Sequence, residues 1–129
     1  MKKYLFLCVA LVLLGCQSSL STTKPQLGEE VEVKVGEKVA FRDAEIILQF
    51  KKVIEDSRCP NGVECVWAGN AKILIRLNQQ SLKLNTHVEP QEETIGKYHI
   101  QLVSLSPYPE FKHAIEQDEY VATFLITQK

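Results

Sequence analysis

Apolar and polar residues alternate along most of this chain, and this period of two constrains the fold more than any other feature. The clearest run covers residues 71–77, where Ala, Ile, Ile and Leu take every second position. Successive side chains of a strand point to opposite faces, so such a run predicts a strand with one buried face. No segment keeps a 3.6-residue period long enough for a core helix.

Further alternating runs cover residues 31–41, 45–55, 82–84, 98–105 and 120–126. The alternation slips at Val53, where a β-bulge near Lys51 and Lys52 would restore the register, and it slips again at Val103 and Leu105. The polar stretches 88–96 and 107–119 are expected to be loops, the second with room for one helical turn. Seven or eight strands with short links predict an all-β fold, either an antiparallel β-sandwich or a small barrel.

Cys59 and Cys65 lie close together in a segment that also holds Trp67, the only tryptophan. An oxidised pair would close about seven residues and stabilise the fold by roughly 2.4 kcal/mol on the chain-entropy model. Trp67 shares the parity of Cys65 in an extended chain, so its indole is expected to pack on the disulfide. A redox pair more often has two intervening residues and a zinc site needs four close ligands, so a structural disulfide is favoured over a metal site or a catalytic thiol.

The first fifteen residues have the pattern of an export signal. Lys2 and Lys3 precede an apolar run over residues 4–14, which is too short for a membrane-spanning helix of about 20 residues. The junction that follows, LLGC ending at Cys16, resembles the lipobox of bacterial lipoproteins. The resemblance implies that residues 1–15 are removed and that acylated Cys16 anchors the protein in the lipid bilayer. Ordinary secretion, with Cys16 as a spare thiol, is the alternative.

Residues 16–29 are rich in Ser and Thr and have no period, which predicts a flexible tether before a β domain at residues 30–129. The resemblance to lipoproteins implies the extracytoplasmic side of the bacterial cell envelope. In enteric bacteria an aspartate after the lipidated cysteine retains a lipoprotein at the inner membrane. Gln17 takes that position here, which implies the periplasmic face of the outer membrane in a Gram-negative host. Export also makes the disulfide the expected state of the cysteine pair.

Two short segments resemble the signature of a family of small exported bacterial proteins and lipoproteins of uncharacterised function. They are DSRCP, starting at Asp56, and CVWAG, starting at Cys65. Family members also carry a Pro-Tyr-Pro-like turn ahead of the final strand, which PYP at Pro107 matches. The resemblance covers roughly residues 39–126 and implies an exported all-β protein. It implies no activity.

The charge balance argues against nucleic acid as a partner, because the net charge is −1 and no basic block is present. Three histidines, His87, His99 and His113, are scattered over loops and a strand. No nucleophile-elbow or metal-helix motif accompanies them, so we predict no catalytic residue, no metal ligand and no cofactor.

Four residues are candidate binding residues: Arg58, Trp67, Tyr108 and Phe111. Arg58 either pairs with a neighbouring carboxylate and fixes the loop, which is favoured, or points outward as a contact. Tyr108 and Phe111 either cap one end of the sandwich or, if exposed, serve as recognition anchors.

Two functions fit these observations. The favoured one is a membrane-anchored, non-catalytic binding or accessory module of the cell envelope, with an envelope protein, a peptide or a glycan as partner. The alternative is a small inhibitor of an extracytoplasmic enzyme that presents the disulfide loop as a rigid wedge. A wedge needs residues 60–64 exposed and protruding. A structural clip, which is the expected role, needs Cys59, Cys65 and Trp67 buried.

Lipidation at Cys16 is the first testable prediction. Cys16→Ser removes the thiol that carries the diacylglycerol, so we expect a larger, unprocessed precursor without labelled fatty acid. Cys8→Ser, within the same apolar run, is the matched control and should be processed normally. Incorporation of label into the Cys16→Ser variant would contradict the lipobox interpretation.

Overall fold

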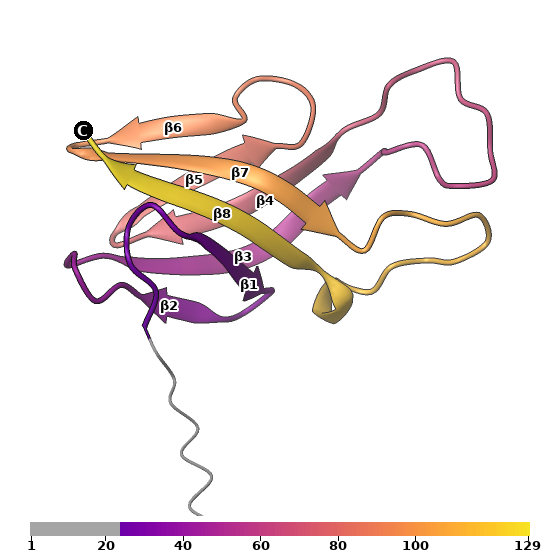
Figure 1. Ribbon diagram of the computed structural model, residues 1–129. Helices are drawn as coiled ribbons and strands as arrows, with labels where there is room; N and C mark the ends of the chain where they lie inside the picture. The colour runs from indigo at the N-terminus through magenta and orange to yellow at the C-terminus, as the bar shows by residue number, and fades with distance from the viewer. Residues whose placement is uncertain (1–23) are drawn as a thin grey trace, which may run out of the picture.

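Eight strands form two antiparallel sheets that pack face to face in the computed structural model, which describes residues 24–129 (Figure 1). The strand order is β1-β8-β7-β6 in one sheet and β2-β3-β4-β5 in the other. The bounds are β1 Glu30–Lys34, β2 Lys38–Ala40, β3 Ile47–Asp56, β4 Ala71–Leu77, β5 Gln80–Asn85, β6 Glu92–Ile95, β7 Tyr98–Ser106 and β8 Val121–Gln128, with a single 3₁₀ turn η1 at Gln117–Glu119. The prediction of an all-β fold with one disulfide, either an antiparallel β-sandwich or a small barrel, is confirmed, and the two sheets make it a sandwich.

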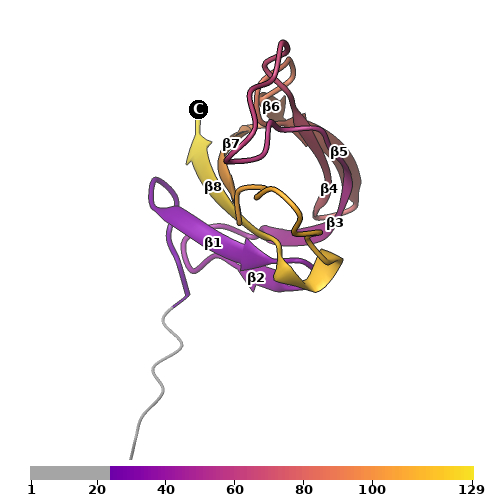
Figure 2. The same cartoon turned by 90° about the vertical axis from the view of Figure 1, so that its right-hand side faces the viewer.

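Alternation along the strands builds the core between the sheets. Every second residue of β4 is buried, as the sequence predicted, and β8 buries Ala122, Phe124 and Ile126 in the same way. Phe50 of β3 meets Phe124 edge to face, with 6.2 Å between ring centroids. Figure 2, viewed from one end of the sandwich, shows the strands surrounding this core.

Register shifts in β3 and β7 explain why the alternation slips. In β3 the register against β4 shifts between Phe50 and Lys52, so that Val53 turns inward, which confirms the bulge expected there. In β7 the register against β8 shifts between Leu102 and Ser104. This shift leaves Val103 exposed and buries Leu105.

Residues 88–96 were predicted to form a loop, and this prediction is wrong for their second half. Glu92–Ile95 form the edge strand β6, which pairs with β7 from Glu92 opposite Gln101 to Ile95 opposite Tyr98. A tight turn at Gly96, with φ of 57°, joins the two strands. The strand is short and begins with two acids, so its sequence lacks the apolar alternation that marks the longer strands.

The ordered domain begins before Glu30. Arg42 N donates to Pro25 O at 3.0 Å, and Gly28 N donates to Ile126 O at 2.8 Å. The entering chain therefore lies at the end of the sandwich where β3 begins and β8 ends (Figure 1). Within residues 24–129, no helix is long and apolar enough to cross a bilayer. The predicted signal peptide, Cys16 and most of the predicted tether lie outside the described residues.

The Phe50 contact gives the second prediction. Phe50→Ala removes a fully buried ring and leaves a cavity between the sheets, which should cost about 3–5 kcal/mol of unfolding free energy. Phe111→Ala is the matched control, because its ring is 59% exposed. Urea denaturation followed by circular dichroism measures both. Equal losses in the two variants would contradict this account of the core.

Candidate functional site

The candidate site lies at the end of the sandwich opposite the entering chain, where two long loops protrude (Figure 1). The disulfide loop, residues 57–70, joins β3 to β4, and the proline loop, residues 107–120, joins β7 to β8. A disulfide joins Cys59 to Cys65, with 6.0 Å between their Cα atoms. Between them, Val63 N donates to Pro60 O at 3.3 Å, and Gly62 takes a φ of 87° in this turn.

The two ends of the disulfide loop are held together by hydrogen bonds and by close contact between their backbones. Ser57 N donates to Asn70 O at 2.7 Å, and Asn70 N donates to Ser57 Oγ at 3.1 Å. A Cβ on Gly69 would lie 2.7 Å from the Cα of Arg58, and Gly69 also has a φ of 73°. Only glycine fits both the space and the backbone angle at this crossing.

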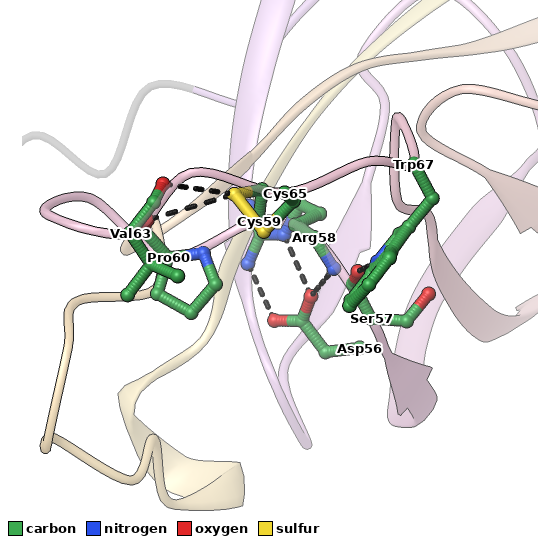
Figure 3. The surroundings of a disulfide bond; sticks show 8 residues. All are labelled: Asp56, Ser57, Arg58, Cys59, Pro60, Val63, Cys65 and Trp67. Atoms are coloured by element: carbon green, nitrogen blue, oxygen red, sulfur yellow. Dashed lines mark hydrogen bonds and ion pairs between the residues drawn. A yellow bond between two sulfur atoms is a disulfide. The ribbon is translucent and has the colours of Figure 1, made fainter.

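Arg58 and Asp56 form a buried ion pair behind the disulfide (Figure 3). Arg58 Nε donates to Asp56 Oδ1 at 2.8 Å, and Nη2 donates to Asp56 Oδ2 at 2.7 Å. This two-point geometry is the strong form of an arginine–carboxylate pair. It depends on the planar guanidinium, which a lysine cannot reproduce.

The same guanidinium reaches across to the other sheet. Arg58 Nη1 donates to Leu105 O at 2.7 Å and Nη2 donates to Pro107 O at 3.0 Å, while the ring of Tyr108 lies 5.1 Å from Arg58 Cζ. Arg58 thus fixes the start of the proline loop as well as its own loop. The interpretation of Arg58 as an outward contact does not fit, because only 8% of the residue is exposed.

Tyr120 completes the buried network by donating its hydroxyl to Asp56 Oδ2 at 3.0 Å. Burial by itself would raise the pKa of Asp56, but the hydrogen bonds and positive charge of Arg58, with the Tyr120 hydroxyl, outweigh it and lower that pKa below its ordinary 3.8. Burial and the Asp56 carboxylate raise the pKa of Tyr120 to about 12. The network is therefore charged at Asp56 and neutral at Tyr120 around pH 7.

Side-chain and backbone bonds tie the proline loop to its surroundings. Asn61 N donates to Pro109 O at 2.9 Å, and Phe111 N donates to Asn61 O at 3.2 Å, so the tips of the two loops are joined. Gln117 accepts from Val53 N at 3.0 Å and donates to Val53 O at 2.9 Å, which satisfies the backbone of β3 beside its bulge.

Five apolar side chains on these loops are exposed, and we call them together the loop-end surface. They are Val63 (38% exposed), Val66 (97%), Trp67 (60%), Tyr108 (48%) and Phe111 (59%). Trp67 and Tyr108 flank the base of the disulfide loop, at Ser57 and Arg58. Phe111 borders its tip, since a Cβ on Gly62 would lie 3.8 Å from Phe111 Cβ.

The expectation that Trp67 packs on the disulfide and closes the core is wrong. Its indole Nε1 donates to Ser57 O at 3.4 Å instead, and the ring lies beside Ser57 and not on the two sulfur atoms (Figure 3). The parity argument failed because the chain between Cys65 and Trp67 is not a strand. Cys59 and Cys65 are half-buried. The disulfide thus shapes an exposed loop and does not seal the interior.

Sequence reasoning singled out Arg58, Trp67, Tyr108 and Phe111, and the structure brings all four to one end of the molecule. It missed the exposure of Val66 and the joining roles of Asn61 and Gln117. The sequence gives little indication that Val66 is exposed, since a valine between a cysteine and a tryptophan is typical of a strand.

The histidines do not gather at one place. His99 Nε2 lies 3.2 Å from Glu92 Oε2, and His113 Nε2 lies 3.6 Å from Glu119 Oε1. Within residues 24–129, no three His, Cys, Asp or Glu side chains are placed to hold a metal ion.

The buried network makes stability depend on pH, which is the third prediction. The folded-state pKa of Asp56 is lowered, so its contribution is present above 3.8 and is lost as the pH falls through the folded-state pKa. Asp56→Asn should cost about 3–5 kcal/mol at pH 7, because it leaves Arg58 buried without its partner. The difference from wild type should shrink below pH 3.8.

The Tyr120→Phe variant tests the pH dependence of stability at alkaline pH. The pKa of Tyr120 is raised to about 12, so its contribution is complete below 10 and is lost as the pH rises toward 12. The wild type should lose stability more steeply than Tyr120→Phe over that interval. Melting temperatures by circular dichroism across the pH range measure both effects. A constant difference between Asp56→Asn and wild type at every pH would contradict the assignment.

No protein-family model, curated protein or solved structure matches this chain. The resemblance to small exported bacterial proteins and lipoproteins therefore stays a prediction, and the site is interpreted from its own geometry.

Proposed function

We propose that the protein is a membrane-anchored, non-catalytic binding module of the bacterial cell envelope, held on the extracytoplasmic side through acylated Cys16. The single observation that carries the proposal is the loop-end surface. Five apolar side chains, three of them aromatic, are exposed together on two loops at one end of the sandwich. Aromatic residues are enriched at protein interfaces and supply much of their binding energy.

Rigidity supports the same proposal. The disulfide, the Arg58 network and the joined loop tips hold the backbone of the two loops in one arrangement before any partner arrives. A loop that is already ordered loses less entropy on binding, so more of the contact energy appears as affinity.

The place of the loops suits an anchored protein. The ordered chain enters beside the start of β3, and the loop-end surface lies beyond the other end of this ten-residue strand, which spans about 33 Å. The eight residue steps from Cys16 to Lys24 can span at most about 28 Å. The loop-end surface therefore lies at the end of the domain that is farther from the acylated anchor.

The fourth prediction tests the surface in cells that acylate the protein. A photo-crosslinking residue is placed at Val66 or Phe111, and at Ile47 as control, because Ile47 is also exposed (50%) but lies at the far end of β3. We expect a discrete adduct from the two loop positions and none from Ile47. The partner identified by mass spectrometry should bind Trp67→Ala at least about tenfold more weakly than wild type.

Two outcomes would contradict the proposal. One is an adduct from Ile47 alone, and the other is unchanged affinity in the Trp67→Ala variant. Because Trp67 is mostly exposed, this substitution should change the unfolding free energy by only about 1 kcal/mol or less, so lost binding would not reflect lost folding.

A second candidate function is supported by one specific observation. Of the residues 60–64 that a wedge-like inhibitor of an extracytoplasmic enzyme would expose, Asn61, Gly62, Val63 and Glu64 are exposed within the disulfide-closed turn, and Pro60 is half-buried. An inhibitor would lower the activity of a purified envelope hydrolase at stoichiometric concentration. This inhibition should be lost in a Cys59→Ser, Cys65→Ser double variant, in which the turn is no longer closed. Undiminished inhibition by that variant would exclude the disulfide loop as the inhibitory element.

A further inference from the structure

The charge of the domain is concentrated around the loop-end surface. The disulfide and proline loops together carry five acids and two bases, which gives −3. The other described residues carry eleven acids and eleven bases, which gives 0. The whole excess of negative charge in residues 24–129 thus lies on the same two loops as the exposed aromatic side chains.

This negative charge is accessible. The five acids, all exposed, are Glu64, Glu110, Glu116, Asp118 and Glu119. Of the two bases, Arg58 is buried and already bonded to Asp56, so Lys112 is the one exposed cation on these loops. Within residues 24–129, the one ion pair that these five acids form is Glu119 with His113, at 3.6 Å. Glu64 and Glu110 are close in sequence to Val63 and Phe111, whereas Glu116, Asp118 and Glu119 lie at or next to η1, before β8. Lys112 Nζ lies 5.3 Å from the centre of the Phe111 ring, so the charges nearest the loop-end surface in the chain are two acids and one base.

We propose that the loop-end surface binds a cationic protein or peptide segment in which lysine or arginine residues flank an apolar patch. This inference rests on the proposed function and names the chemistry of its partner. The exposed aromatic side chains supply the apolar contact, and Glu64 and Glu110, which outnumber Lys112 beside them, favour a partner of opposite charge. Complementary charge also speeds encounter, which matters for a protein confined to a membrane surface.

The same charge disfavours two other occupants. Nucleic acid binding depends on neutralising phosphates with basic side chains, and these loops offer one exposed lysine. Anionic lipid headgroups attract basic segments and would repel five carboxylates. The exposed tryptophan and phenylalanine are thus directed at a protein surface, although such residues also occur at membrane interfaces.

A random-peptide phage library, panned on the acylated protein in detergent micelles, tests the inference. We expect selected peptides to combine apolar residues with lysine or arginine. Their affinity should fall as sodium chloride is raised from about 50 mM to about 500 mM, since salt screens exposed charges. Binding should also change the emission of Trp67, which is the only tryptophan in the chain.

Charge-reversal variants distinguish an effect of the acids beside the loop-end surface from an effect of the protein's net charge. Glu64→Lys with Glu110→Lys reverses two acids beside the surface, and we expect the selected peptides to bind about tenfold more weakly or worse. Glu30→Lys with Glu45→Lys is the matched control, with the same change in net charge on exposed acids elsewhere on the domain. The control should stay within about twofold of wild type, because Glu30 begins β1 and Glu45 precedes β3, at the end of the sandwich opposite the loops, where salt screens their charges from the site.

The remaining outcomes overturn the inference in different ways. Selected peptides that are acidic or uncharged, yet depend on Trp67 and Phe111, would refute the partner's charge and leave the proposed binding function standing. Failure to select any peptide that depends on Trp67 and Phe111 would refute both. Quenching of Trp67 by brominated lipids in vesicles that carry the acylated protein would show that the surface enters the membrane, which also overturns the inference.

Discussion

The two-point bond between Arg58 and Asp56 is the interaction on which the rest of the site depends. It joins the end of β3 to the carbonyls of Leu105 and Pro107 at the end of β7, and through Tyr120 to the start of β8. A buried charge is costly unless it is paired and fully hydrogen-bonded, and here both conditions are met. The two sheets are thus fastened at this end by polar contacts, whereas apolar packing fastens them elsewhere.

Much of the fold could be predicted from the sequence, because the period of two is a direct consequence of strand geometry. This period predicts β4 and β8, and the change of parity at Val53 could be recognised as a bulge. The edge strand β6 could not be found in this way. Its four residues bury little apolar surface, and its place depends on pairing with β7, which lies beyond local pattern.

The site could be predicted only in outline. Arg58 and the aromatic side chains could be chosen from residue type alone. An arginine near an acid is a candidate for an ion pair, and aromatic residues among prolines are candidates for binding contacts. Which of them would be buried could not be deduced, because that depends on how two loops distant in sequence cross. Trp67 shows the limit: its burial was inferred from strand parity, and parity has no meaning in a loop.

The crossing at Gly69 has a consequence for how this protein tolerates change. Gly69 and Ser57 close the base of the disulfide loop with backbone contacts, and Arg58 is anchored inward from that base. Residues 61–64 and 66–68 are all exposed, so apart from Gly62, whose φ of 87° favours glycine, their identities are little constrained by packing of the core. Substitutions at these exposed positions should therefore leave the packed core unchanged. The domain is suited to act as a scaffold on which a new specificity is installed by rewriting a few exposed positions.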